Sequence, residues 1–156
     1  MIGADSTVAV EPIRRARQRY GHTLAVAWFS TAGLLRPGQP LAAVLSGTPR
    51  IGGGRAALIG ARTMSPDEWR HVWEGRVRYL PARAARVPAV VSSCLLETDP
   101  DEVYVHISLD VLDPGGLTAA ELTAGVRALA RAVPVVGTSI ASGGREVPEA
   151  LAELVT

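Results

Sequence analysis

The residues best suited to chemistry gather in one segment, 103–114, with the sequence V-Y-V-H-I-S-L-D-V-L-D-P. The apolar residues within this segment are typical of a buried parallel strand. Successive side chains of a strand point to opposite faces of the sheet. We therefore expect His106, Ser108 and Asp110 to point to one face near the carboxyl end of that strand. Ligands of open α/β sheets bind just beyond such strand ends. The segment thus predicts a small-molecule site in which Asp110 is the candidate for acid–base chemistry.

Each of these side chains also has a structural interpretation. Asp110 is either a general acid or base whose pKa is raised by burial, or a carboxylate satisfied by Ser108, Ser30 and backbone donors. His106 lies deeper in the strand and is either a core histidine with satisfied nitrogens or a ligand contact. The three residues are not a catalytic triad, because neighbours two apart on a strand lie side by side and do not converge.

Strand and helix signals alternate along the whole chain. Short apolar runs predict strands at 24–30, 56–60, 77–80 and 134–140 besides the central segment, with Met1-Ile2 as the end of another. Helical patterns lie between them, at 8–20, 41–45, from Ser65 onward, and at 84–96, 119–132 and 147–155. This alternation predicts one three-layer α/β/α domain, residues 1–156, built on a parallel sheet.

Local signals predict where helices begin. Ser6 or Thr7 is expected to cap the first helix, and Thr118 the helix that follows the central segment. Ser65-Pro66-Asp67-Glu68 combines a cap, a proline at the first helical position and two acids in the first turn. The aromatic and apolar residues after it, Trp69, Val72 and Trp73, are expected to pack on the sheet. The run Gly52-Gly53-Gly54 does not lead from a strand into a helix, so it predicts a turn and not a phosphate-binding loop.

Composition excludes several classes of protein. The formal net charge is +1 and all 16 basic residues are Arg, so no global field attracts nucleic acid or membrane. The cluster of Arg14, Arg15, Arg17 and Arg19 predicts a solvated helix face. Neither a signal peptide nor a membrane-spanning run is indicated. The single Cys94 permits no internal disulfide, which suits a cytoplasmic protein.

Motifs spread over nearly the whole chain resemble those of the ureohydrolase family, which includes arginases and agmatinases. Segment 3–7, G-A-D-S-T, lies where the family has G-G-D-H-S, and segment 28–34, W-F-S-T-A-G-L, lies where it has H-F-D-A-H-x-D. Segment 37–40, P-G-Q-P, resembles H-G-Q-P, and segment 106–114 resembles S-x-D-x-D-x-x-D-P. The resemblance implies an arginase-like α/β fold.

Family chains are longer, mainly before the position of Met1. The resemblance therefore implies a sheet truncated at one edge to about five or six strands, with the strand at 134–140 at or near the bared edge. Exposed sheet edges pair readily with other chains, so we expect a homo-oligomer or a partner chain at that edge.

The residues that hold two manganese ions in the family are mostly replaced in this chain. The resemblance assigns those six positions to Ser6, Ser30, Ala32, Leu34, Ser108 and Asp110. Only Asp110 carries a metal-binding group, and one carboxylate cannot hold a binuclear cluster. The substrate-facing Glu of the family corresponds to Ser142. We therefore expect no metal, no other cofactor and no arginase or agmatinase activity.

Three functions are compatible with this pattern. The first is a metal-independent enzyme that cyclises, isomerises or dehydrates a small molecule, in specialised metabolite biosynthesis, with Asp110 as its catalytic residue. The residues expected to contact the substrate are Ser6, Ser30, Ser108, Ser142 and His106. The second is a non-catalytic pseudoenzyme that serves as a binding or assembly partner. The third is a residual mononuclear-metal hydrolase.

Overall fold

Six parallel strands form the centre of the molecule in the computed structural model, which describes residues 1–47, 49–52 and 54–155. The strand order is β1-β6-β5-β2-β3-β4. The strands are β1 (Ile2–Gly3), β2 (Leu24–Phe29), β3 (Ala56–Ile59), β4 (Arg78–Leu80), β5 (Glu102–Ser108) and β6 (Val135–Ala141). Gly53, in the predicted glycine turn, lies outside the described residues.

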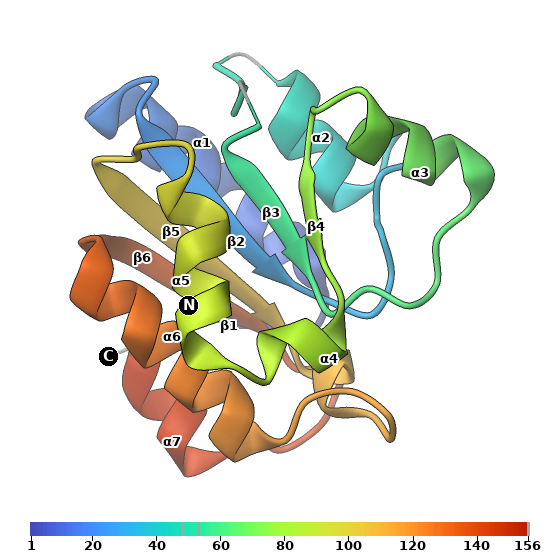
Figure 1. Cartoon of the computed structure of the whole chain (residues 1–156), viewed down its shortest axis with the longest axis vertical. Helices are drawn as coiled ribbons and strands as arrows, with labels where there is room; N and C mark the ends of the chain where they lie inside the picture. The colour runs from blue at the N-terminus through green and yellow to red at the C-terminus, as the bar shows by residue number, and fades with distance from the viewer. Residues whose placement is uncertain (48, 53, 156) are drawn as a thin grey trace.

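Helices connect the strands and cover both faces of the sheet (Figure 1). The α-helices are α1 (Val10–Tyr20), α2 (Pro40–Ser46), α3 (Pro66–Trp73), α4 (Ala82–Ala85), α5 (Pro88–Leu96), α6 (Ala119–Ala132) and α7 (Glu149–Ala152). Within the described residues there are also three short 3-10 helices, η1 (Ser6–Ala9), η2 (Leu109–Leu112) and η3 (Glu153–Val155). The predicted three-layer α/β/α architecture is therefore confirmed.

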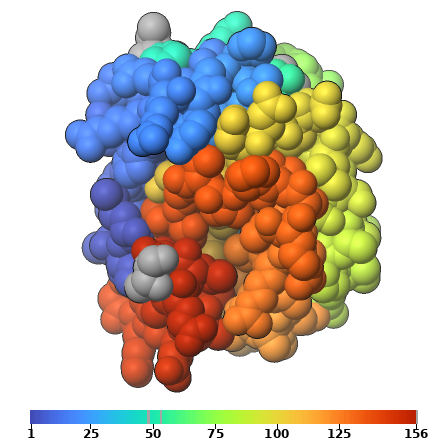
Figure 2. Space-filling view, turned by 90° about the vertical axis from the view of Figure 1, so that its left-hand side faces the viewer, coloured from blue at the N-terminus to red at the C-terminus, as the bar shows by residue number. Residues whose placement is uncertain are grey.

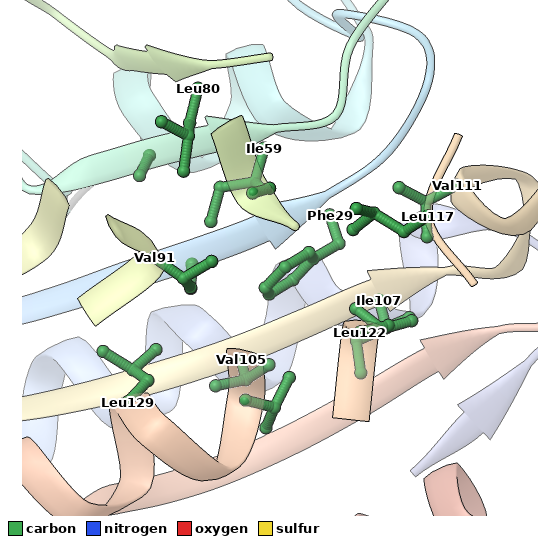
Figure 3. Packing of buried hydrophobic residues seen from close by; sticks show 14 of the residues in the cluster. Phe29, Ile59, Leu80, Val91, Val105, Ile107, Val111, Leu117, Leu122 and Leu129 are labelled. Carbon is green, nitrogen blue, oxygen red and sulfur yellow. The ribbon is translucent and has the colours of Figure 1, made fainter. Parts of the chain in front are cut away.

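Two apolar cores separate these layers, because alternate residues of each strand face opposite sides. Phe29 and Ile107 point toward α4 to α7, where Val91 and Leu122 pack against them (Figure 3). Trp28, the residue next to Phe29, points toward the layer of α1 and α2. Most residues of β2, β3 and β5 are buried, as in a parallel sheet covered on both faces.

Three local expectations need correction. The carboxylate of Asp5, not Ser6 or Thr7, caps η1 by accepting the N–H of Thr7 at 2.9 Å. The chain leaves the strand after Ser108, so Asp110 lies in the 3-10 turn η2 and not on β5. Trp73 is 75% exposed and does not pack on the sheet, because α3 turns a different face inward.

The predicted position of β6 near a sheet edge is confirmed. The two-residue strand β1 pairs only with Ile140 and Ala141 of β6 within the described residues. Beside the remainder of β6 lies a hollow of about 310 Å³, bounded by α6, β6 and η3. Figure 2 shows this side of the molecule, where orange and red segments surround the hollow. One edge of the sheet is therefore only partly covered.

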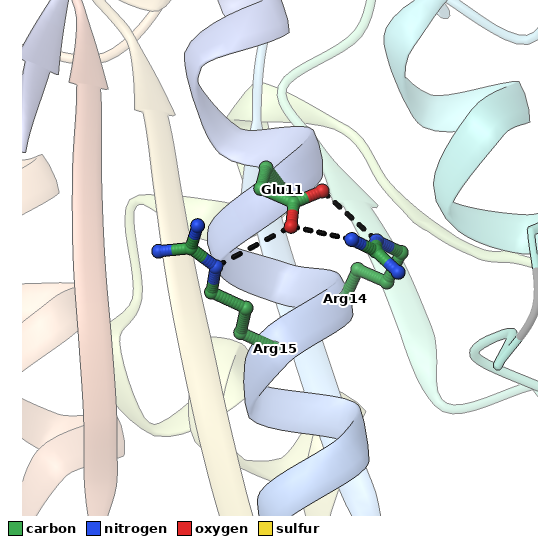
Figure 4. Close-up of polar contacts among 3 residues, drawn as sticks. All are labelled: Glu11, Arg14 and Arg15. Carbon is green, nitrogen blue, oxygen red and sulfur yellow. Dashed lines mark hydrogen bonds and ion pairs between the residues drawn. The ribbon is translucent and has the colours of Figure 1, made fainter.

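The outer surface of α1 carries the clustered arginines. Glu11 bonds Arg14 at 2.5 Å and Arg15 at 3.3 Å, and all three side chains are largely exposed (Figure 4). Arg14 lowers the pKa of Glu11 through this hydrogen bond. The exposure of Arg14 and Arg15 agrees with the solvated helix face that the sequence predicted. None of the helices in the described residues is long and apolar enough to cross a membrane.

Candidate functional site

A cleft of about 450 Å³ opens beyond the carboxyl ends of β1, β5 and β6, where the sequence predicted a ligand site. It is lined by Ala4, Asp5, Ser6, Thr7, Leu34, Pro40, Ser108, Asp110, Ala141, Ser142, Gly143 and Arg145. Four of the predicted site residues therefore share one cavity: Ser6, Ser108, Asp110 and Ser142. Ser30 and His106, the other two, are fully buried and do not line it.

Asp110 is held at the mouth of the cleft by the 3-10 turn that follows β5. Its Oδ1 accepts the N–H of Thr31 at 3.2 Å. Among the described residues, Oδ2 has no hydrogen bond, and neither Ser30 nor Ser108 donates to the carboxylate. The side chain is only partly buried. Among the described residues, one carboxylate oxygen therefore has no hydrogen-bond partner, which differs from the fully satisfied alternative.

Arg145 is the one cation among the described residues that line the cleft, and the sequence analysis did not identify it. It follows Ser142-Gly143-Gly144, the turn after β6, and its Nη1 lies 2.5 Å from Oδ1 of Asp113. That hydrogen bond raises the pKa of Arg145, and the charge of Asp110 adds a smaller effect in the same direction. We call Asp110, Asp113 and Arg145 the charged rim. The sequence signal that could have identified Arg145 is its position directly after the glycine turn at the end of a strand.

A second polar group lies behind the cleft, in the layer between the sheet and α1. The imidazole of His106 contacts the Ser139 hydroxyl at 2.7 Å through Nδ1 and the Ser6 hydroxyl at 3.0 Å through Nε2. Its ring centroid lies 4.3 Å from that of Trp28. Burial lowers the pKa of His106 from its ordinary 6.5 to about 3. We call Ser6, His106 and Ser139 the buried cluster; only Ser6 reaches the cleft.

The loop after β2 forms one wall of the cleft through Leu34. Its backbone is anchored from inside by Glu68 of α3, which is only 5% exposed. Oε2 of Glu68 accepts the N–H of Leu35 at 3.1 Å, and Oε1 accepts the N–H of Ser65 at 3.1 Å. A Cβ at Gly33 would lie 2.3 Å from Oε2. Glycine is therefore required at position 33 for the carboxylate to reach the loop.

The side chains around the cleft do not fit a binuclear metal centre. Among the described residues, no group of three His, Cys, Asp or Glu side chains lies close enough to hold a metal ion. Ser30 uses its hydroxyl to accept the N–H of Ala32 at 3.3 Å, so it stabilises the loop. Leu34 contributes only apolar surface to the cleft. The donor set that manganese requires is absent from these positions.

A larger cavity, about 740 Å³, lies away from the strand carboxyl ends, between α2 and the segments that precede β3 and β4. Its lining includes the apolar Leu35 and Ile51 and the polar Arg50, His71 and Glu74. Volume alone does not define a site of chemistry. The smaller cleft is the candidate site, because it combines the strand-end position with a carboxylate, a guanidinium and hydroxyl groups.

Comparison with solved structures finds the same fold in arginases and in a formiminoglutamase. The arginase from Bacillus cereus matches with a TM-score of 0.77 and 20% identity, over 89% of this chain and 60% of that chain. The arginase from Bacillus caldovelox matches with a TM-score of 0.76 and 24% identity, over 89% and 58%. The formiminoglutamase from Trypanosoma cruzi matches with a TM-score of 0.77 and 14% identity, over 90% and 54%.

These matches confirm the arginase-like fold that the motifs predicted. The chain spans about 60% of the length of the arginase from Bacillus cereus. No protein-family model matches the sequence, and no curated protein matches it. The likeness is therefore one of fold, and function has to be argued from the cleft.

Proposed function

We propose that this protein is a metal-independent enzyme that acts on a small molecule in the cleft, by acid–base and positioning catalysis. One observation carries the proposal: a single cavity combines the Asp110 carboxylate, the Arg145 guanidinium and the hydroxyls of Ser6, Ser108 and Ser142. An acid–base group, an anion-binding group and hydrogen-bonding hydroxyls are what a small polar substrate needs for orientation and proton transfer.

Asp110 is the proposed proton-transfer residue. The Thr31 N–H fixes one carboxylate oxygen, and the partial exposure of the side chain leaves the other accessible to substrate. Arg145 would hold an anionic group of the substrate, since its bond to Asp113 uses only part of its five-donor fork. Cyclisation, isomerisation and dehydration require only such proton transfer and orientation. A carboxylate-bearing metabolite is therefore the proposed substrate class.

Hydrogen–deuterium exchange tests this proposal even when the product has not been identified. The protein, treated with EDTA, is incubated in D2O with a panel of amino acids and 2-oxo acids, and loss of substrate C–H signals is followed by NMR. We expect at least one panel member to exchange faster than its uncatalysed rate. Asp110→Asn is expected to reduce that enhancement at least 100-fold, because the base is removed.

Asp99→Asn is the matched control for this experiment. It removes the same charge at an exposed position whose φ of 51° asparagine tolerates well. The control is expected to retain full exchange activity. Equal activity in Asp110→Asn, or exchange that disappears on EDTA treatment, would refute the metal-free acid–base proposal.

A second candidate function, assembly without catalysis, is favoured by the partly covered edge of the sheet. β1 protects only the last part of β6, and the adjoining hollow is lined largely by apolar residues such as Val126, Val136 and Val155. A second copy of the chain is the proposed occupant of that edge. Sedimentation velocity over a wide concentration range is expected to reveal a dimer; a monomer throughout would oppose this function.

A further inference from the structure

The larger cavity, about 740 Å³, lies outside the cleft and has no part in the proposed function. Residues of both α2 and α3 line it, on the side of the sheet that carries β3 and β4 (Figure 1). Its volume is in the range of sites that enclose small molecules. None of the described residues that line it also lines the cleft, so a ligand here would be held by a separate set of side chains.

The charge of the chain is distributed unevenly along the sequence. Residues 1–77 contain ten Arg and five acidic residues, whereas residues 78–156 contain six Arg and ten acidic residues. The first part includes α1, α2 and α3, and the second includes α4 to α7. The net charge of +1 therefore conceals a basic part, and every residue that lines the larger cavity belongs to it. The potential of this part favours anionic ligands.

Two arginines reach this cavity from neighbouring turns of the chain. Arg50 belongs to the segment before β3, and Arg76 belongs to the segment before β4. The two segments touch, because a Cβ at Gly54 would lie only 3.2 Å from the carbonyl oxygen of Gly75. Glycine at position 54, where φ is 70°, permits this close approach. Both guanidinium groups are therefore placed in the lining of one cavity.

The side chain of Arg50 can bind a ligand without breaking an existing contact. Among the described residues, no hydrogen bond or ion pair involves its guanidinium. Its backbone carbonyl, in contrast, accepts the Nε–H of Arg17 at 3.0 Å. The next residue, Ile51, donates its N–H to the carbonyl of Val44 at 3.2 Å. The backbone that carries this cation is therefore tied to α1 and α2, while the guanidinium keeps all five donors.

Arg76 is only partly neutralised by the protein. Its Nη2 lies 3.1 Å from Oε2 of Glu74, and 61% of its side chain is exposed, so other donors of the fork are unused. His71 of α3 also lines the cavity, and its buried Nδ1 has no hydrogen-bond partner among the described residues. The charged lining thus consists of two guanidinium groups against one carboxylate. It matches a ligand with at least one negative charge.

We propose that this cavity binds a phosphorylated small molecule, whose phosphate group contacts Arg50 and Arg76 and whose apolar body packs against α2. A phosphate group has three terminal oxygens and accepts from guanidinium groups that approach from different directions, whereas a carboxylate has two oxygens in one plane. The inference goes beyond the proposed function and does not depend on it. The apolar residues that line the cavity are Leu35, Pro37, Ala42, Leu45 and Ile51.

Phenyl phosphate is the probe for this site, because it joins a phosphate group to a small apolar ring. It is titrated into the full chain at pH 7.5, and NMR spectra of the backbone amides and the arginine side chains are recorded. Saturable shifts at Ala42, His71 and Arg76 are the expected result. Inorganic phosphate and phenol each lack one half of the probe and should bind at least tenfold more weakly. Equal binding of inorganic phosphate, or no shift at these residues, would overturn the proposal.

Charge variants then assign the binding groups. Arg50→Gln is expected to weaken the binding of phenyl phosphate about tenfold, because a cation is lost. Glu74→Gln is expected to strengthen it about threefold, because Arg76 loses its competing partner. A gain in affinity cannot result from a variant that fails to fold. Arg131→Gln, at an exposed position of α6, is the matched control and should bind as wild type. Unchanged affinity in both Arg50→Gln and Glu74→Gln would overturn the proposal.

Arg145→Gln separates this site from the cleft, whose lining contains the other arginine that a phosphate group could contact. The variant is expected to keep the shifts at Ala42 and His71. Shifts confined to Ser142 and Gly143, and lost in Arg145→Gln, would overturn the inference and support anion binding in the cleft. Saturable shifts at Ala42 and His71 without hydrogen–deuterium exchange on any substrate would support the inference alone.

Discussion

The charged rim lies at the cleft and the buried cluster lies behind it, and the two groups are built differently. Arg145 and Asp113 form an ion pair in which half of the arginine side chain and about a third of the aspartate remain exposed. His106 is completely buried, and both of its ring nitrogens have partners. The rim therefore keeps its charges in contact with water at little cost to folding, whereas the cluster is part of the packed interior.

The same contrast explains how the cleft can stay polar without a cluster of carboxylates. Several carboxylates crowded together need cations to balance them, and their loss would leave costly like charges. Here the charged side chains of the charged rim are partly exposed to solvent, and the buried cluster consists of two neutral hydroxyls and an uncharged imidazole. Charge is thus confined to the part of the cleft where water screens it.

His106→Ala gives the largest expected effect, because it breaks the buried cluster while the charged rim is intact. The substitution leaves a cavity beside Trp28 and removes the partner of both Ser6 and Ser139. We expect a loss of about 3 kcal/mol in the free energy of unfolding, measured by urea denaturation. A loss below about 1 kcal/mol would show that the cluster is not integral to the fold.

The pH dependence of stability is a second test of the buried cluster. The folded-state pKa of His106 is about 3 and the ordinary value 6.5, so only the unfolded chain binds a proton between these values. Stability is therefore complete above pH 6.5 and falls as the pH decreases toward 3. At pH 5 the loss attributed to His106 is about 2 kcal/mol. His106→Gln should remove this component from denaturation curves recorded at pH 8 and pH 5.

Arg145→Gln tests the other side of the cleft. The ion pair with Asp113 is exposed, so its removal is expected to leave the melting temperature unchanged. Binding of a small dicarboxylate such as succinate, followed by NMR titration, should weaken about tenfold because the cation is lost. Arg127→Gln, on α6 and outside the cleft, is the control and should bind as wild type. A large fall in stability would place Arg145 among the structural residues.

Manganese is expected to have the smallest effect. Asp110 alone supplies a metal-binding group among the six positions that the ureohydrolase resemblance assigns. Elemental mass spectrometry should detect no stoichiometric manganese after incubation and desalting, and the melting temperature should not move. Tight binding with a raised melting temperature would restore metal-dependent hydrolysis as the leading function.

Much of the fold follows from local sequence signals, and the parts of the site that do not follow depend on distant contacts. Thr118 caps α6 with the predicted geometry, and α6 has the predicted bounds, because the capping box lies within four residues. Asp110 was misplaced because the alternating pattern continues into η2, where a 3-10 turn replaces the strand. The place of Arg145 depends on its contacts with the Leu109 carbonyl and the Asp113 carboxylate, which are far away in sequence.

The carboxylate of Glu68 shapes one wall of the cleft before any ligand binds. It holds the backbone at Leu35 from the interior of the protein, so the adjoining wall of the cleft takes its shape as the chain folds. A ligand that enters needs to order little of this wall, and the conformational entropy lost on binding is correspondingly small. For the small-molecule ligand proposed above, we therefore expect association to be limited by diffusion and orientation, and ligands to differ mainly in their dissociation rates.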